Sequence, residues 1–428
     1  MRIGIQTWGS HGDIRPLLAL AEKLQSSGHK VSLAITCIDS AEYNESISKT
    51  GVKIQSVASP VIQDKEDYAK IENIIFNESN PIKQLQTILT RLFEPAEAEM
   101  HQVAERLCID NDLVIGHFFH YPLHIAAEKA RCPYVSIMLV HSAIASTLQP
   151  PTGFPNLGKL GNRLTWWLIR SVLNKNIKPY ADRLRVAHGL KPANDLMTDI
   201  WASHQMNLIA ISPEICQRQN DWPDHYQVCG FFDMPNFSLE GELSGSLEEF
   251  LSQGDSPTFI TFGSAMPSDT HAQKETLTLL FEAIQIANCR AIIQAPLWQE
   301  CGIKSTQKVH FVNACPHSAV FPRCNIIIHH GGAGTTQAVT LAGKPSIVVA
   351  YIAEQEFWGR ELERVGIAPA PLSRKKLSAE QLAKTIKDVF NSREIKEQAR
   401  NIGVKMNKED GVGMAVKLIN KKFENRIR

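Results

Sequence analysis

The 428-residue sequence lacks a strong net charge, closely spaced cysteine pairs and a long apolar run, and each absence excludes a class of protein. Its 45 Lys and Arg balance 44 Asp and Glu to a formal net charge of +1, which argues against broad nucleic-acid binding. Its nine cysteines are scattered without a C-x-x-C pair, so neither a disulfide framework nor a zinc knuckle is expected. This usage predicts reduced thiols in a cytosolic protein.

No apolar run is long enough to span a bilayer, and residues 1–8 are typical of a buried strand rather than a signal peptide. The G-x-G-x-x-G dinucleotide fingerprint is also absent. A hydrophobic content of 43% and a charged content of 21% are typical of globular proteins. The length predicts two domains of similar size, and the expected location is the cytoplasm.

The strongest chemical signal is the segment His-His-Gly-Gly-Ala-Gly-Thr-Thr at residues 329–336. It lies between a strand-like run at 325–328 and a helical segment at 337–343. The first N–H groups of a helix lack intrahelical partners, and glycines let this backbone approach an anion closely. The two threonines add hydroxyl donors, and His330 adds a ring N–H or a positive charge. A turn with glycines for packing alone is the alternative, but this composition favours a phosphate site.

A second glycine-bearing turn spans residues 9–13, directly after the first predicted strand. An amphipathic helix is expected from Ile14 to Ser27, with Pro16 in its first turn, where a missing N–H costs nothing. A strand over 30–35 then completes a βαβ unit. The loop of such a unit lies at the carboxyl end of the sheet, where doubly wound sheets bind ligands.

Strand-like and helical segments alternate in two series along the chain. The first series runs to residues 208–211, and the second starts at residues 258–264. Residues 221–224, Asp-Trp-Pro-Asp, are typical of a linker between them. We therefore expect two α/β halves with a ligand cleft between their facing loops.

Several short motifs follow one another at the spacing of a known enzyme family. They are Asn-Ala-Cys-Pro-His at 313–317, Phe-Pro-Arg-Cys at 321–324, the segment 329–336, Ala-Gly-Lys-Pro at 342–345 and Glu-Gln-Glu-Phe-Trp-Gly at 354–359. Together they resemble the nucleotide-sugar signature of family 1 glycosyltransferases, in particular sterol 3β-glucosyltransferases and bacterial natural-product enzymes. Gly9-Ser10-x-Gly12-Asp13-x-x-Pro16 is similar to the N-terminal acceptor-side motif of the same family. The resemblance covers nearly the whole chain.

This resemblance implies the GT-B fold, an α/β architecture of two Rossmann-like, doubly wound parallel-sheet domains that face a cleft. The expected divisions are an acceptor-binding domain over 1–215, a linker over 216–235, a nucleotide-sugar domain over 236–405, and a helix within 406–428 that returns to the first domain.

The resemblance also assigns residues to the donor. His330 falls at the position of the α-phosphate ligand. Glu354 and Gln355 fall where the hexose hydroxyls bind, a task that suits a carboxylate and an amide. Further donor contacts are assigned to Ser10, Gly12, Ser264, Cys315, Gly332, Gly334 and Thr335. For Cys315, packing is favoured over a role as nucleophile.

The nucleotide base stays open on the sequence. Ala314 stands where the plant small-molecule branch has a base-stacking Trp, and Ala338 where that branch has a ribose-binding Glu. A UDP-sugar is the expected co-substrate, and a dTDP-sugar is the alternative. No cofactor and no metal is expected, because the helix start and His330 can stabilise the leaving diphosphate.

Asp13 falls at the position of the family's catalytic base. A carboxylate there can take the proton of an acceptor hydroxyl as that oxygen attacks C1 of the sugar. Asp13 can instead act as the N-cap of the helix that follows, and both roles can hold together. His11, two residues earlier, is the competing base.

Three further histidines follow predicted strands. His117, His120 and His141 are expected to line the acceptor pocket. His117, His120 and His124 also have spacings reminiscent of metal ligands, but a strand end and a turn disfavour one common site. Trp166-Trp167, with the basic residues around it, belongs to a core-packing helix pair, to a lid over the acceptor, or to a weak peripheral contact with a membrane.

The sequence therefore predicts an inverting glycosyltransferase that moves a hexose, with glucose from UDP-glucose as the first candidate, onto a hydroxyl of a lipophilic acceptor. Sterols, terpenoids, polyketides and glycolipids are acceptors of this kind. The alternatives are a sugar-nucleotide epimerase on the same fold and a non-catalytic nucleotide-sugar binding protein. An epimerase would turn over the donor without an acceptor, and a binding protein would bind UDP without transfer.

Overall fold

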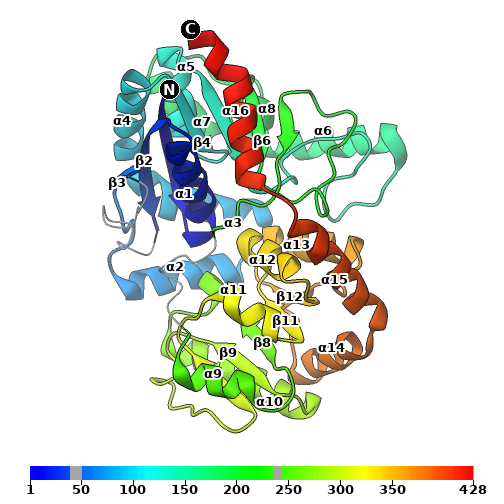
Figure 1. Ribbon diagram of the computed structural model, residues 1–428. Coiled ribbons are helices and arrows are strands. Elements are labelled where there is room, and N and C mark those ends of the chain that lie inside the picture. Colours follow the sequence, from blue (N-terminus) through cyan, green and yellow to red (C-terminus); the bar gives the residue numbers. More distant parts are fainter. Residues whose placement is uncertain (39–50, 235–242, 428) are drawn as a thin grey trace. The chain divides into compact units, whose positions relative to one another are not determined.

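The computed structural model describes residues 1–38, 51–234 and 243–427, which form two compact α/β units (Figure 1). Unit 1 comprises Met1–Asp64, Glu78–Asp233 and Glu409–Arg428. Unit 2 comprises Lys65–Asn77 and Met234–Lys408. The predicted start of the second domain, at residue 236, lies outside the described residues.

Unit 1 is built on a seven-stranded parallel sheet in the order β3-β2-β1-β4-β5-β6-β7. Its strands are β1 (Arg2–Gly9), β2 (Lys30–Cys37), β3 (Lys53–Ser56), β4 (Leu113–His117), β5 (Tyr134–Met138), β6 (Met206–Ile209) and β7 (Tyr226–Val228). In the central strand β1 every residue from Ile3 to Gly9 is buried. Burial along a whole strand is what a parallel sheet with helices on both faces requires.

Eight α-helices belong to the described residues of unit 1. They are α1 (His11–Ser26), α3 (Pro81–Ile88), α4 (Glu94–Asp110), α5 (Tyr121–Ala130), α6 (Gly158–Asn176), α7 (Lys178–Ala187), α8 (Leu196–Asp199) and α16 (Gly411–Ile427). A π-helical turn, Leu89–Phe93, joins α3 to α4. The last helix, α16, is fastened to the unit by the His29 ring, which lies 2.9 Å from the Asn420 amide oxygen, and by the Lys422 ammonium, which donates to the carbonyl of Gln205.

Unit 2 is built on a six-stranded parallel sheet in the order β10-β9-β8-β11-β12-β13. Its strands are β8 (Thr258–Thr261), β9 (Ala291–Gln294), β10 (Val309–Val312), β11 (Ile326–His329), β12 (Ser346–Ala350) and β13 (Leu372–Ser373). Its helices are α2 (Lys65–Asn77), α9 (Gly245–Ser252), α10 (Thr270–Ala287), α11 (His317–Val320), α12 (Ala333–Leu341), α13 (Ala353–Arg364), α14 (Ala379–Asn391) and α15 (Arg393–Met406).

The unit 2 sheet has an apolar cluster on each face. In β8, Phe259 and Ile260 pack into different clusters, and in β11 Ile327 and Ile328 do the same. This is the two-residue period of a strand whose faces are both covered. Burial of each such side chain contributes about 1.5–3 kcal/mol, so these apolar strands hold the loops at their ends in place.

Two elements differ from the boundaries expected on the sequence. Strand β7 falls inside the predicted linker 216–235, yet it pairs with β6 and extends the unit 1 sheet. Helix α2 precedes residue 215 but clusters with unit 2. There Ser268 donates to the Glu72 carboxylate, the Lys375 ammonium donates to the Asn77 carbonyl at 3.0 Å, and Phe76 packs on the Tyr351 ring. Long-range contacts, rather than position in the chain, decide both memberships.

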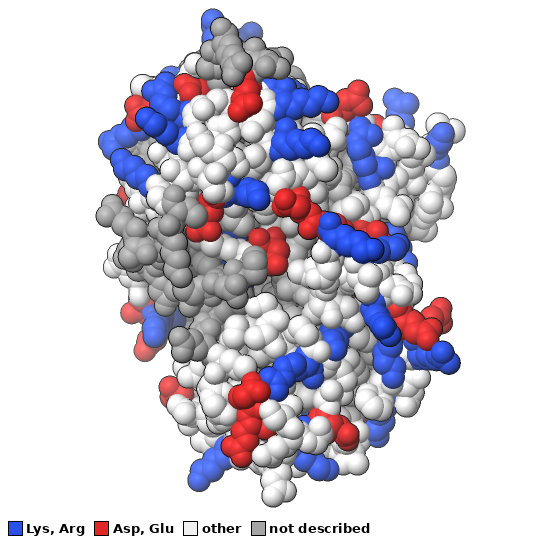
Figure 2. Space-filling model, viewed as in Figure 1, with Lys and Arg blue, Asp and Glu red and all other residues white. Residues whose placement is uncertain are grey.

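Charges of both signs are interspersed on the face drawn in Figure 2, as the net charge of +1 leads one to expect. Within the described ranges, no helix combines the length and the apolar character needed to cross a membrane.

Candidate active site

Each sheet reverses its strand order once. In unit 1 the chain adds β2 and β3 on one side of β1 and β4 to β7 on the other, and in unit 2 the reversal lies between β8 and β11. The loops leave such a pair of strands in opposite directions, which opens a crevice at their carboxyl ends where α/β proteins bind ligands. The residues that follow β1, β4, β8 and β11 are therefore the candidate functional residues.

The loop after β1 is shaped by a bond between Ser10 and Asp13. The Ser10 backbone N–H donates to Asp13 Oδ2 at 2.9 Å, and the Ser10 hydroxyl lies 3.1 Å from the same oxygen. Ser10 is the N-cap and Asp13 the third residue of α1, an arrangement that satisfies the free N–H at a helix start. The prediction that the helix begins at Ile14 is wrong, because this bond starts it at His11. Pro16 consequently lies in the second turn, where the helix has no N–H for the carbonyl of Gly12.

The second oxygen of Asp13 faces the end of β4. Asp13 Oδ1 lies 3.8 Å from Nε2 of His117, and the Asp13 side chain is 36% exposed. Burial lowers the pKa of His117 to about 3, so its imidazole is neutral at neutral pH. The switch point of unit 1 thus pairs a half-exposed carboxylate with a buried, neutral imidazole.

Gly9 makes this position of Asp13 possible. Its φ of +136° is disfavoured for residues that carry a Cβ. A Cβ there would also lie 2.3 Å from Asp13 Oδ2. On the sequence Gly9 belonged to the acceptor-side motif but had no role of its own, although it ends the buried strand directly before the Ser10 cap.

The other predicted acceptor-pocket histidines are placed differently. His120 is fully buried, and its Nδ1 accepts the N–H of Leu123 at the start of α5. His141 is buried in the segment that follows β5. His124 packs its ring on Tyr134, with the ring centroids 4.9 Å apart. His117 is the predicted pocket histidine that the described contacts place beside Asp13, with its Nε2 3.8 Å from Asp13 Oδ1.

One cluster in the described part of the chain has metal-ligand chemistry, and it is not the trio of His117, His120 and His124, for which a metal was disfavoured. The ligand atoms of His101, Glu105 and His188 lie within 4.8 Å of one another. However, the Lys129 ammonium donates to Glu105 at 3.1 Å, and the rings of His101 and His188 contact each other with centroids 3.8 Å apart. These groups already use one another as partners, so we assign no metal to them.

In unit 2 the glycine-rich turn follows β11 and starts α12. His330 is 8% exposed and lies between two glycines. A Cβ on Gly332 would lie 2.4 Å from His330 Nε2, and one on Gly263, which follows β8, would lie 3.1 Å from His330 Cε1. The switch point of this sheet therefore brings the loops of β8 and β11 together on one imidazole.

The polar atoms of this turn are incompletely paired. Among the described residues, His329 Nε2, His330 Nδ1 and Thr336 Oγ1 are buried without a hydrogen-bond partner. Buried polar atoms of this kind call for a ligand or water to pair with them. Burial lowers the pKa of His330 to about 4, so the ring offers a neutral N–H rather than the positive charge that the sequence left open.

Helix α13 begins against the same turn. Gly331 has a φ of +89°, and a Cβ there would lie 2.6 Å from the backbone oxygen of Gln355. The amide oxygen of Gln355 accepts the backbone N–H of Tyr351 at 2.7 Å and that of Ile352 at 3.3 Å. This oxygen caps α13, so the NH₂ group of Gln355 is the part of the amide that can donate a hydrogen bond to a ligand. The exposed Glu354 precedes it on the first turn of the helix.

The remaining predicted donor residues have different surroundings. Cys315 is 2% exposed in the apolar cluster around Phe259 and Phe321, so its side chain packs there, as expected on the sequence. Gly334 and Thr335 are half-buried on the first turn of α12, and Gly12 is exposed on the first turn of α1. The side chain of Ser264 lies outside the described set.

His329 was not assigned a role on the sequence. Its Nδ1 accepts the N–H of Gly331 at 3.2 Å, which fixes the turn from inside. The doubled histidine after the strand was the available signal, because one ring faces the core while the next can face the loop.

Two family models match the chain. The glycosyltransferase family 28 N-terminal domain matches residues 3–136, and the erythromycin biosynthesis protein CIII-like C-terminal domain matches residues 291–411. A sterol 3-beta-glucosyltransferase of Arabidopsis thaliana is 28% identical over 97% of this chain. The O-mycaminosyltylonolide 6-deoxyallosyltransferase of Streptomyces fradiae is 26% identical over all of this chain and 98% of its own. The chain belongs to the GT-B glycosyltransferases.

The solved glycosyltransferase VinC, in complex with DTDP, superposes with a TM-score of 0.63 over 99% of this chain and all of that chain, at 17% identity. At this identity the likeness shows the fold alone. The family models and the two named relatives confirm the predicted family and the predicted enzyme class. The structural likeness confirms the GT-B fold class. The sterol 3-beta-glucosyltransferases are longer than this glycosyltransferase, which spans 67% of the Arabidopsis relative and 35% of one from Saccharomyces cerevisiae.

His330→Ala should weaken UDP binding to this glycosyltransferase about 10- to 150-fold, because a hydrogen bond to a charged group contributes about 1.5–3 kcal/mol. Titration calorimetry measures the affinity. His271→Ala, at an exposed position of α10, is the matched control and should bind UDP like the wild type. Equal affinity in both variants would remove His330 from the phosphate site.

Gly9→Ala should lower glycosyl transfer about 100-fold or more while UDP affinity stays unchanged, because the new Cβ displaces the Asp13 carboxylate. Gly28→Ala is the control, since Gly28 also has a positive φ, of +91°, but nothing lies within 4 Å of its Cβ position. Initial rates and UDP titrations distinguish the two. Similar rates for both variants would show that the position of Asp13 does not matter.

Proposed function

We propose that this protein is an inverting glycosyltransferase that moves a hexose from a nucleoside diphosphate to a hydroxyl of a lipophilic acceptor. The observation that carries the proposal is the pair of switch points. One holds a glycine-rich turn with unpaired buried donors and acceptors, and the other holds Asp13 facing His117. The first suits a diphosphate, and the second suits removal of a proton.

Unit 2 is assigned to the donor. The N–H groups at the start of α12 and the ring of His330 would receive the diphosphate, and Glu354 with the NH₂ group of Gln355 would bind the hexose hydroxyls. The sterol glucosyltransferases support glucose as the hexose, and UDP-glucose is the first candidate donor. The DTDP bound to VinC supports a thymidine nucleotide as the alternative.

Unit 1 is assigned to the acceptor and the base. The Asp13 carboxylate takes the proton of the acceptor hydroxyl, and the oxygen attacks C1 of the hexose on the side opposite the diphosphate. The C1–O bond to the diphosphate breaks, its electron pair leaves with the phosphate oxygen, and the configuration at C1 inverts. The neutral His117 can hold Asp13 by donating from Nε2. The donors of unit 2 stabilise the charge of the leaving group.

The acceptor class follows from the relatives. A sterol and a tylonolide are named for the Arabidopsis and Streptomyces enzymes, and both are lipophilic alcohols. Because such acceptors partition into lipid, we also propose that the protein makes weak, peripheral contact with a membrane surface. A cytoplasmic location fits the nine cysteines, all within the described ranges, because none of them forms a disulfide. The epimerase alternative is not favoured, since the named relatives are transferases.

Asp13→Asn should keep the fold and the UDP affinity but lose about 10²- to 10⁴-fold in transfer rate. The amide oxygen can still accept the Ser10 N–H, so only the proton acceptor is lost. His11→Ala and His117→Ala complete the experiment, read by product formation and UDP titration. A dead His11→Ala or His117→Ala beside a nearly normal Asp13→Asn would move the base to that histidine. A joint loss in Asp13→Asn and His117→Ala with intact UDP binding would identify a pair that acts together.

Transfer should persist in excess EDTA, because N–H donors at the start of α12 stabilise the leaving diphosphate. Activity before and after chelation is the measurement. Loss in EDTA with recovery on adding Mg²⁺ or Mn²⁺ would overturn this description of leaving-group stabilisation.

A further inference from the structure

Helix α6 turns several of its polar side chains toward the protein and many of its apolar side chains toward solvent. Four side chains at four-residue spacing, Asn162, Trp166, Arg170 and Asn174, form its inner stripe and bind the body of unit 1. Asn162 donates to the Thr147 carbonyl at 3.1 Å, and the Trp166 indole N–H donates to the Gln149 carbonyl at 2.9 Å. A surface helix normally turns its apolar side inward and its polar side to solvent.

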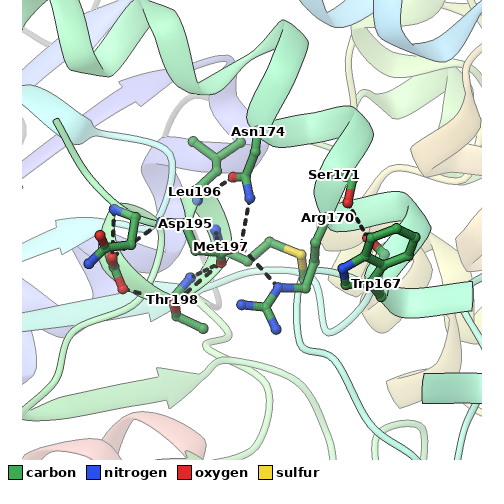
Figure 3. Close-up of polar contacts among 10 residues, drawn as sticks. Trp167, Arg170, Ser171, Asn174, Asp195, Leu196, Met197 and Thr198 are labelled. Carbon is green, nitrogen blue, oxygen red and sulfur yellow. Dashed lines mark hydrogen bonds and ion pairs between the residues drawn. The ribbon is translucent and has the colours of Figure 1, made fainter. Parts of the chain in front are cut away.

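The second half of the stripe is held by one carboxylate (Figure 3). Asp195 Oδ2 accepts from Arg170 Nε at 3.0 Å and from Asn174 Nδ2 at 2.9 Å. Its Oδ1 accepts the N–H groups of Met197 and Thr198, each at 3.0 Å, as the cap of α8. Asn174 in turn accepts the Leu196 N–H at 2.8 Å. These bonds fix the rotation of α6 about its own axis.

The solvent-facing side of α6 is apolar. We call it the α6 face, and its residues are Leu157 at 63% exposure, Leu160 at 84%, Leu164 at 58%, Trp167 at 62%, Leu168 at 50% and Val172 at 43%. The interpretation of this segment as a core-packing helix pair therefore holds for Trp166, which is buried, but not for Trp167. Contiguous exposed apolar surface of this kind marks an interaction site.

The charges around the α6 face select its partner. Helix α6 contains Lys159, Arg163, Arg170 and Lys175 and no carboxylate, and the sequence has no Asp or Glu between Glu128 and Asp182. Arg170 is used by Asp195, whereas Lys159, Arg163 and Lys175 are exposed. Apolar side chains with an interfacial Trp, flanked by cations and free of acids, match a lipid surface with anionic headgroups.

We propose that the α6 face docks this protein on the surface of an anionic phospholipid bilayer. Leu160, Leu164 and Trp167 insert at the boundary between headgroups and acyl chains, and the exposed basic residues contact lipid phosphates. The benefit of docking rests on the proposed lipophilic acceptor, which a membrane would supply, but docking itself requires neither donor nor acceptor. Because its inner stripe is bonded to unit 1, α6 serves as a fixed docking ridge rather than a hinged lid.

The test is co-sedimentation of the full chain with phosphatidylcholine vesicles, with and without about one quarter phosphatidylglycerol. The wild type should bind the anionic vesicles more tightly. The double variant Leu160→Gln/Trp167→Gln should bind them at least about tenfold more weakly, because it removes inserted apolar area. Ile109→Gln, at another exposed apolar side chain, is the control and should bind like the wild type.

A second pair of variants tests the electrostatic part. Arg163→Glu/Lys175→Glu should abolish the preference for phosphatidylglycerol, and raised salt should do the same to the wild type. Lys384→Glu, at an exposed position of α14, is the charge-matched control. Equal vesicle binding by the wild type and both α6 variants would overturn the proposal.

Two other results would assign the α6 face to another occupant and so overturn the proposal. A wild-type dimer that becomes a monomer in Leu160→Gln/Trp167→Gln, without vesicle binding, would assign it to a second copy of the chain. If the wild type does not bind vesicles and the same double variant loses transfer to a micelle-dispersed acceptor, the α6 face would be assigned to the acceptor. Vesicle binding by a protein that transfers no sugar would instead refute the proposed function and leave the docking surface in place.

Discussion

Both halves of the proposed site depend on backbone that passes closer to a polar group than any side chain would allow. A Cβ on Gly9 would lie 2.3 Å from Asp13 Oδ2, and one on Gly331 would lie 2.6 Å from the backbone oxygen of Gln355. Gly9 ends β1 and Gly331 follows β11, so at both places the chain can turn sharply over the carboxyl edge of its sheet. Without these turns Asp13 would not face His117, and α13 would not begin against the glycine-rich segment.

The glycine-rich turn contains buried polar atoms that lower the stability of the fold but could bind a ligand. His329 Nε2, His330 Nδ1 and Thr336 Oγ1 are buried without partners among the described residues, and each such atom costs about 1–3 kcal/mol. Burial keeps both imidazoles neutral, with pKa values of about 3 for His329 and about 4 for His330. The apolar strands beneath the turn offset this cost, and a bound diphosphate would supply the missing partners.

Helix α6 likewise has side chains in unfavourable surroundings, on the outer surface of unit 1. The polar side chains of its inner stripe donate to Asp195 and to backbone carbonyls, and the leucines and Trp167 are left exposed to solvent. Periodicity alone predicted a helix there but could not decide which side faces the core. Trp166 and Trp167 are the same residue type, yet the first is buried and the second is exposed. The hydrogen bonds of Asn162, Arg170 and Asn174 decide it.

The sequence by itself determined the GT-B glycosyltransferase family, through short motifs spread along the chain. It also predicted a phosphate site, because residues 329–336 carry strand end, glycines, donors and helix start in one contiguous segment. It also contained the start of α1 in the Ser10-x-x-Asp13 pattern, which was overlooked. The tertiary structure alone decided that His117 meets Asp13, through the pairing of β1 with β4, that β7 joins the first sheet, and that α2 joins unit 2. Such pairings depend on contacts between residues far apart in the chain, which local propensity and spacing do not encode.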